Sequence, residues 1–211
     1  PIFHTAELYE GVRFLKVASI DPGSWKLPVD EELKTAIVFV IDTTISMKPY
    51  IDRTRQAVRN IFDRIERAGQ ADKVAFGLVA YRNSTEKTPG LEYVSRVLSP
   101  LRDGSRRPEF EQALARATEA TVSSHAFNED AFAGIKTAIE ALDWSGYQSR
   151  LLFLITDAGA VRNDDPFSTT HMNAAQIADL AAAENIKMFV LHLKTAAGRR
   201  RNNHTFAQTQ Y

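Results

Sequence analysis

The sequence contains no cysteine, and this absence excludes thiol catalysis, cysteine–zinc sites and disulfide scaffolds together. An excess of charge of one sign is also missing, because 26 Lys and Arg residues are balanced by 26 Asp and Glu residues. A chain without net charge has no global field that would attract a nucleic-acid backbone or an anionic membrane. The composition therefore argues against a dedicated nucleic-acid-binding protein.

Long apolar runs are absent as well. None approaches the roughly 20 residues that a membrane-spanning helix needs, so we expect no direct membrane insertion by this fragment. The first residues, 1–4, show neither an initiator methionine nor a signal-peptide pattern, and we expect the chain to be part of a longer protein. Its 211 residues, 44% of them hydrophobic, suit one globular domain with an extension.

Phosphate-binding motifs are missing too. The ten glycines form no Gly-x-Gly, so the dinucleotide fingerprint and the kinase glycine loop are absent, and no Gly-x4-Gly-Lys loop occurs. The five histidines form no pair of the zinc-protease kind. His192, near the end of an apolar run, is either a crevice residue or, more commonly for such a position, a hydrogen-bonded structural histidine. The run 199–201 is three arginines, which either meet an anionic partner or form a solvated basic turn.

Short apolar runs alternate with segments of helical periodicity, which is typical of an α/β protein. The run 36–41 is apolar on both faces, as in a central parallel strand covered by helices on each side. Further strands are predicted at 73–81, 91–98, 151–156 and 187–193, and helices at 51–65, 108–120, 129–142 and 172–183. The link before 91–98 is too short for a helix and favours an antiparallel edge strand. We expect a doubly wound, mostly parallel central sheet with one antiparallel edge strand and helices on both faces.

The two ends of the chain fit this alternation poorly. Residues 12–20 could form a strand, but the Pro and Gly residues that follow set them apart. After residue 194 the pattern fades, although a further helix could begin there without room to pack fully. We therefore expect an N-terminal extension over residues 1–33 and a main domain over 34–211 that is truncated at its C-terminal end.

Polar side chains gather where two predicted strands end. The strand 36–41 runs into Asp42, and the strand 151–156 runs into Asp157, so both carboxylates should emerge at one edge of a parallel sheet. Thr44 and Ser46 follow Asp42 at alternate positions. Such an all-oxygen cluster suits Mg²⁺, with Mn²⁺ as a close substitute. The plainer alternative is that Ser46 caps the next helix and that the aspartates cap loops.

Two stretches resemble a known family. The segment Val38 to Met47, with its Asp-Thr-Thr-Ile-Ser sequence, resembles the first strand and metal-ion-dependent adhesion site (MIDAS) of von Willebrand factor type A domains, with Thr44 in place of the middle serine of Asp-x-Ser-x-Ser. Leu151 to Gly159 resembles the second aspartate loop of that family. The resemblance implies a protein-interaction or sensing module that is not an enzyme, in which an acidic side chain of a protein partner completes the coordination of the metal.

One departure from the family pattern concerns the loop before the helix at 129–142. The family usually supplies a threonine there, and this chain has none between residues 124 and 135. We expect Asp130, or failing that Glu129, to lie nearest the metal, which makes Asp42, Thr44, Ser46, Asp130 and Asp157 the predicted metal site. Acidic residues in a first helical turn can also serve only the helix dipole.

Two further expectations concern the wider context. An aspartate after a first parallel strand is also the nucleophile of haloacid-dehalogenase-like phosphohydrolases, and Asp42 would take that role here. Their reaction requires a second aspartate two residues later as general acid, and position 44 is a threonine. The run from Asp42 to Arg59 resembles the type A domains of bacterial serine/threonine kinases of the PpkA kind, associated with type VI secretion. That resemblance implies a larger bacterial signalling protein with its kinase domain elsewhere, and an extracytoplasmic, periplasmic location for this region.

Overall fold

The computed structural model describes residues 7–9, 12–14 and 33–211, and contacts divide the chain into two compact units, 1–32 and 33–211. In the first unit, β1 (Glu7–Tyr9) and β2 (Val12–Phe14) form an antiparallel pair. The strand expected over 12–20 is therefore present over 12–14, and its remainder lies outside the described residues. The interpretation of residues 1–33 as an extension stays a prediction.

The second unit is built on a five-stranded sheet in the order β5-β4-β3-β6-β7. The strands are β3 (Thr35–Asp42), β4 (Val74–Tyr81), β5 (Ser95–Asp103), β6 (Ser149–Thr156) and β7 (Ile186–His192). All neighbouring pairs are parallel except β4 and β5, which run antiparallel at one edge. The predicted doubly wound, mostly parallel sheet with one antiparallel edge strand is confirmed.

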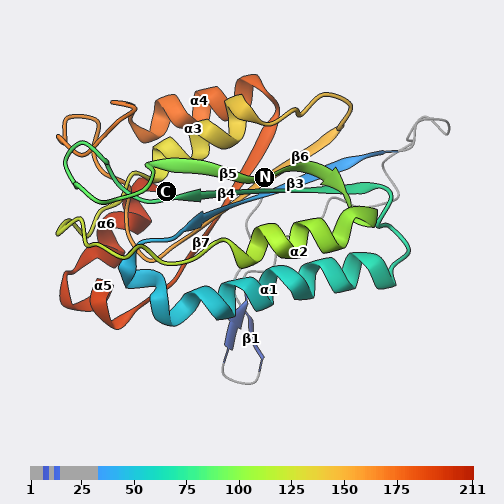
Figure 1. Ribbon diagram of the computed structural model, residues 1–211, viewed down its shortest axis with the longest axis horizontal. Helices are drawn as coiled ribbons and strands as arrows, with labels where there is room; N and C mark the ends of the chain where they lie inside the picture. Colours follow the sequence, from blue (N-terminus) through green and yellow to red (C-terminus); the bar gives the residue numbers. More distant parts are fainter. Residues whose placement is uncertain (1–6, 10–11, 15–32) are drawn as a thin grey trace. The chain divides into compact units, whose positions relative to one another are not determined.

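The central strand β3 contributes to two hydrophobic cores because its side chains alternate between the faces of the sheet. Ala36, Val38 and Val40 pack on the side of α3 (Ala131–Ala141) and α4 (Ala174–Ala183). The residues between them, such as Phe39, pack on the side of α1 (Lys48–Arg67) and α2 (Arg107–Ala115). Figure 1 shows the resulting three layers, with one helix pair above the sheet and one below.

Two elements differ from the boundaries that the sequence predicts. The helix expected over 108–120 ends at Ala115, because the chain then turns so that the amide of Ala120 donates to the carbonyl of Thr43 at 2.8 Å. The edge strand lies at 95–103 rather than 91–98. The apolar residue Tyr93 contributed to that earlier pattern, but it is buried outside the sheet, where its hydroxyl bonds Thr43.

The end of the chain forms two short helices, α5 (Ala196–Arg200) and α6 (Asn203–Gln210), at the edge where the parallel strands end (Figure 1). Contrary to the expectation that this segment lacks room to pack, α6 is anchored on the loop after β6. The Asn203 side chain accepts from the amide of Gly159 at 2.8 Å, and Gln210 donates to the carbonyl of Ala160 at 2.9 Å. The segment after β7 thereby braces the loop that carries Asp157.

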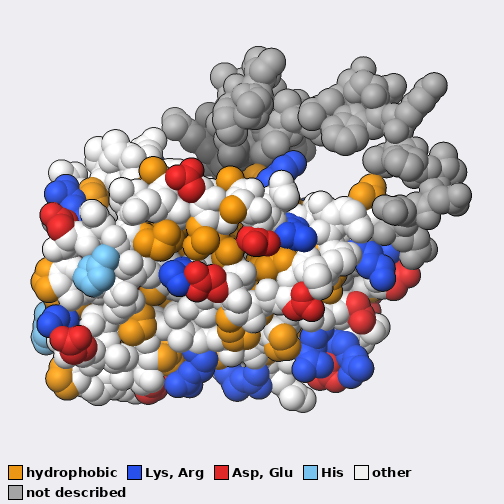
Figure 2. All heavy atoms as spheres, turned by 90° about the horizontal axis from the view of Figure 1, so that it is seen from above, with side chains coloured by type: hydrophobic (Ala, Val, Ile, Leu, Met, Phe, Trp, Pro, Cys, Tyr) orange, Lys and Arg blue, Asp and Glu red, His pale blue; other side chains and the backbone are white. Residues whose placement is uncertain are grey.

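The surface of the second unit shows no segregation of charge on the face seen in Figure 2, where acidic and basic side chains are interspersed. This agrees with the formal net charge of zero. In the part of the chain that the structure describes, no helix is both long and apolar enough to span a bilayer.

Candidate functional site

The loop after β3 is folded around the carboxylate of Asp42. This carboxylate accepts hydrogen bonds from the amide of Thr44 at 2.9 Å and from the Thr44 hydroxyl at 2.6 Å. The chain then enters a 3-10 turn, Ile45–Met47, which leads into α1. Ser46 caps neither element, because the N-cap positions are Thr44 and Met47 and neither makes a side-chain cap. The capping alternative for Ser46 is therefore wrong.

The Ser46 hydroxyl instead connects the loop to β6, the neighbouring strand. It donates to a carboxylate oxygen of Asp157 at 2.9 Å and lies 3.1 Å from the Thr44 hydroxyl. Asp42, Thr44, Ser46 and Asp157 thus form a continuous chain of hydrogen-bonded oxygens. The parallel register explains the meeting, because Ile41 of β3 lies beside Ile155 of β6 and both strands end at the same edge.

Two further hydroxyls complete the network. Thr156 donates to the second carboxylate oxygen of Asp42 at 3.2 Å, and Thr195, from the loop after β7, donates to Asp157 at 3.0 Å. The sequence analysis singled out neither residue. Thr156 is adjacent to Asp157, so its place at the site was open to prediction. Thr195 follows the end of another parallel strand, which is the one signal that could have pointed to it.

The electrostatics of the two aspartates favour a cation. Both are fully buried, and within residues 33–211 neither forms an ion pair with Lys, Arg or His. Burial, together with the nearby charge of Asp157, raises the pKa of Asp42 to about 7, although hydrogen bonds from Thr44 oppose this shift. Burial also raises the pKa of Asp157. A divalent ion would offset both like charges, and an all-oxygen donor set suits Mg²⁺ or Mn²⁺.

Carboxylates alone do not make a metal site here. Among the described residues, no three His, Asp or Glu side chains converge closely enough to hold an ion by themselves. A divalent ion at Asp42 and Asp157 would therefore need the hydroxyls of Thr44 and Ser46 as further ligands. Hydroxyl, carboxylate and water oxygens are acceptable to a hard divalent cation, so the donor set fits the predicted metal.

The structure does not bring Asp130 into this network. Its carboxylate caps α3 by accepting from the amide of Ala133 at 3.3 Å. The other oxygen accepts from the amide and the hydroxyl of Thr169 at 2.8 and 2.7 Å. The reason is the position of Asp130 at the start of the helix, where the free amides of the first turn attract a carboxylate. These three hydrogen bonds hold Asp130 to α3 and to the loop of Thr169.

Glu129, the alternative to Asp130, faces the site. It is 4% exposed, and its carboxylate accepts from the Asn83 side chain at 2.7 Å. Burial raises the pKa of Glu129 well above its ordinary value, and the charges of Asp42 and Asp157 raise it further. Glu129 therefore lines the cavity over the loop after β3, whereas Asp130 does not.

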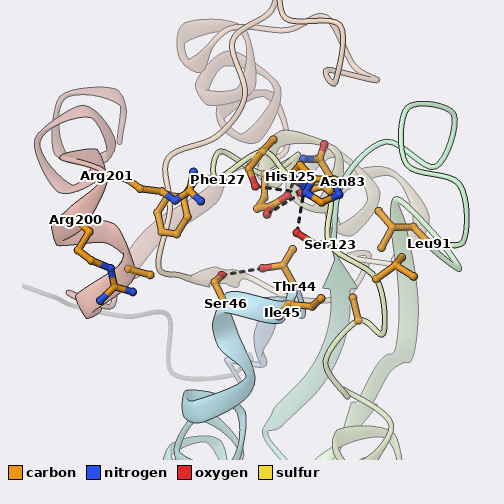
Figure 3. A pocket seen from close by; sticks show the side chains of 16 residues that line it. Thr44, Ile45, Ser46, Asn83, Leu91, Ser123, His125, Phe127, Arg200 and Arg201 are labelled. Carbon is orange, nitrogen blue, oxygen red and sulfur yellow. Dashed lines mark hydrogen bonds between the residues drawn. The ribbon is translucent and has the colours of Figure 1, made fainter.

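A cavity of about 320 Å³ opens over this site. Thr44, Ser46 and Glu129 contribute to its floor, and its other walls come from the loops after β4, α2 and β7. Figure 3 shows Thr44 and Ser46 between Arg200 and Arg201 on one side and Leu91 on the other. The Thr44 and Ser46 end of the oxygen network thus lies at the base of a concave surface of a size suited to a few side chains of a ligand, with Asp42 and Asp157 buried beneath it.

Comparison with known proteins agrees with this geometry. The model of the von Willebrand factor type A domain family matches residues 36–208. The chain belongs to this family. The match includes both aspartate loops as well as α5 and most of α6, and it confirms the resemblance that the sequence motifs indicated.

Solved structures of other type A domains share the fold. The pilus adhesin SpaC from Lactobacillus rhamnosus GG, in its open conformation, matches with a TM-score of 0.58 and 17% identity over 78% of this chain and 24% of its own. Proximal thread matrix protein 1 from the mussel byssus, solved with a zinc-occupied MIDAS motif, matches with a TM-score of 0.54 and 16% identity, over 77% of this chain and 36% of its own. The SpRpn10 VWA domain matches with a TM-score of 0.52 and 15% identity, over 80% of this chain and 79% of its own. A comparison with curated protein sequences found no match.

These likenesses establish the fold, and the family is one of metal-dependent interaction modules. The chain spans about a quarter of the length of the SpaC adhesin, so the larger protein around it is a matter for proposal.

His192 lies outside the oxygen network of the type A site. Its Nε2 lies 2.6 Å from Nδ1 of His204, whose Nε2 in turn approaches the carbonyl of Thr195 at 3.1 Å. His192 does not line the cavity over the site. Burial lowers the pKa of His192 to about 4. The residue is therefore a neutral, hydrogen-bonded structural histidine that links β7 to α6.

Proposed function

We propose that this type A domain is a metal-dependent protein-interaction module in which Asp42, Thr44, Ser46 and Asp157 hold one Mg²⁺ or Mn²⁺ ion. The observation that carries the proposal is the continuous chain of oxygens between two buried aspartates that lack a cationic partner within residues 33–211. When bound, the ion supplies an electrophilic position for a carboxylate oxygen of a protein partner.

The chain's own residues have separate roles in this proposal. Asp42 and Asp157 provide negative charge, and the Thr44 and Ser46 hydroxyls provide neutral donors. Thr195 holds Asp157 in place from the loop after β7. Glu129, the alternative to Asp130 that the sequence offers, takes the place of the family's threonine as a polar group that faces the cavity beside the ion.

Calorimetric titration with MgCl₂ tests the metal site. The wild-type chain should show one binding event, and Asp42→Ala should abolish it. The matched control is Asp179→Ala, because Asp179 is exposed on α4 and forms no ion pair among the described residues. Binding by Asp42→Ala with wild-type affinity, or no heat with any of the three proteins, would contradict the proposal.

The phosphohydrolase alternative gains no support from the geometry. Position 44 carries a hydroxyl that donates to Asp42, where that chemistry needs a carboxylic acid able to protonate a leaving group. The chain with MgCl₂ and p-nitrophenyl phosphate should therefore show no sustained turnover. Turnover that is lost in Asp42→Asn would favour the enzyme instead.

We further propose that the module is part of a larger bacterial signalling protein, a serine/threonine kinase of the PpkA kind associated with type VI secretion, and that it lies outside the cytoplasm. The support is the resemblance of residues 42–59, which form the metal loop and the first part of α1. An antibody against this region should detect, in the native cells, a longer polypeptide whose tryptic peptides include kinase motifs. A native polypeptide without them would refute this part.

A further inference from the structure

The rim of the cavity over the metal site carries two unpaired cations. Arg200 and Arg201 line the cavity, and both are exposed. Within residues 33–211 neither forms an ion pair, whereas Arg107 on the far end of the domain contacts three carboxylates. The guanidinium of Arg201 lies 5.4 Å from the ring of Phe127, which is also a lining residue.

The position of these arginines is tied to the metal site. They end or directly follow α5, whose N-cap is Thr195, and the Thr195 hydroxyl both receives the amide of Gly198 and donates to Asp157. The carbonyl of Thr195 is in turn held by His204 of α6. The arginines thus sit on a short helix anchored to a metal ligand, rather than on a loose tail.

Charge counting explains why such cations are useful here. Two aspartates neutralise a divalent ion, and an ionised Glu129 would leave the floor of the cavity with a net negative charge that repels an acidic ligand. Arg200 and Arg201 make the net charge around the cavity positive instead. The sum of about plus one attracts an acidic ligand, and because the arginines lie to one side of Thr44 and Ser46, they can pair with an acidic group other than the metal-bound one.

The opposite side of the cavity has a different character. Ile45, Leu91 and Val122 also line the cavity, and Figure 3 shows Ile45 beside Thr44, and Leu91 and the arginines on opposite sides of Thr44 and Ser46. Ile45 is 38% exposed, so its side chain is available to a ligand in the cavity. A ligand crossing the cavity would therefore meet positive charge, then the metal site, then an apolar wall.

We propose that the cavity selects a segment of a partner protein that carries two acidic side chains and a neighbouring apolar one. One acidic side chain occupies the metal site, so this inference rests on the proposed function. The second pairs with Arg200 and Arg201, and the apolar side chain packs against Ile45, Leu91 and Val122. Arginine forks suit carboxylates because they can donate two parallel hydrogen bonds.

Other anionic ligands fit the surface less well. Recognition of anionic lipid by charge needs a cluster of about 4–8 basic residues, and a nucleic-acid backbone engages comparable numbers. Two arginines beside a cavity of about 320 Å³ with an apolar wall offer too few charges for either, but enough for one short peptide. A protein segment is thus the occupant that charge and shape favour.

A random peptide library displayed on phage, panned with MgCl₂ against the wild-type chain, tests the proposal. We expect enrichment of peptides with two acidic residues within a few positions of each other and an apolar residue beside them. The enriched sequence and its analogue with glutamine for the second acid are then measured by fluorescence anisotropy. Two charge-assisted pairs should make the diacid peptide bind roughly tenfold more tightly than the analogue.

The double variant Arg200→Gln/Arg201→Gln should remove this tenfold difference and leave magnesium binding intact. The matched control, Arg53→Gln/Arg64→Gln, makes the same charge change on exposed positions of α1 and should keep the difference. Enrichment of single-acid peptides, no enrichment at all, or equal effects of the two double variants would overturn the proposal. Binding to phosphatidylglycerol vesicles in place of peptides would also overturn it.

Failure of the proposed function has a different signature. If Asp42→Ala and added chelator leave the diacid peptide binding unchanged while Arg200→Gln/Arg201→Gln abolishes it, the arginine subsite stands and the metal-dependent part falls.

Discussion

The substitution Asp42→Asn should change how the stability of the metal-free domain depends on pH. Burial and the charge of Asp157 raise the pKa of Asp42 from 3.8 to about 7. The folded state therefore binds this proton more tightly than the unfolded state. The stability that the protonated group contributes is fully present below pH 3.8 and is lost as the pH rises from about 4 to about 7.

The size of the effect follows from these two pKa values. Linkage gives a gain of about 3 kcal/mol for the wild type between pH 8 and pH 5 from Asp42 alone, and about 4 kcal/mol at still lower pH. An asparagine cannot ionise, and it keeps the oxygen that accepts from Thr44. At pH 8 without metal, Asp42→Asn should therefore be more stable than the wild type, and at pH 5 the two should be nearly equal.

Urea unfolding with chelator at pH 8 and pH 5 measures the difference. The wild type alone is a poor reporter, because burial lowers the pKa of His192 to about 4 and this residue destabilises the folded state as the pH falls. Subtracting the variant from the wild type removes that contribution. Asp179→Asn, which changes an exposed position on α4, should reproduce the wild-type pH dependence.

The opposite sign would refute the reasoning. If the metal-free Asp42→Asn domain is less stable than the wild type at pH 8, then the buried Asp42 carboxylate is stabilised as an anion without metal. The inference that the site requires a cation would then fail.

Three further predictions concern the fold and the third acidic group. Amides of residues 36–41 should be among the slowest to exchange with deuterium, since a central strand opens only with the whole domain, and fast exchange there would contradict the sheet order. Gly134→Ala should cost roughly 1–3 kcal/mol in urea unfolding, because the added Cβ would lie 2.9 Å from side-chain carbons of Tyr81; an unchanged midpoint would disprove that close approach. Glu129→Gln should weaken magnesium binding in calorimetry, whereas Asp130→Asn should spare it and lower stability by about 1 kcal/mol, and the reverse pattern would restore Asp130 to the site.

The sheet was predictable because its strands carry strong local patterns. The run 36–41 is apolar on both faces, and only a strand between two helix layers satisfies that pattern. Element ends were less predictable where a distant contact decides them. Ala120 is not helical because its amide donates to the carbonyl of Thr43. Tyr93 is buried outside the sheet, where its hydroxyl forms a hydrogen bond with Thr43, a residue distant in the sequence.

The residues of the site also fall into a predictable and an unpredictable group. Asp42, Thr44, Ser46 and Asp157 were predictable because each follows a strand end at a spacing that the family motif shares. The choice between Asp130 and Glu129 was not, because adjacent residues at a helix start point in different directions. The cap of α3 and the bonds from Thr169 hold Asp130, and only the fold shows that Glu129 lines the cavity instead.

The order in which the site assembles follows from the distance along the chain between its parts. Ser46 and Asp157 hydrogen-bond across 111 residues, and Thr195 reaches Asp157 across 38 more. Contacts of such long range form late, after the loop entropy has been overcome. A metal ion that needs both aspartate loops therefore finds no site in a partly folded chain. Magnesium should leave the refolding rate unchanged and lower the unfolding rate. The ion would then increase the kinetic stability of a domain that has already folded.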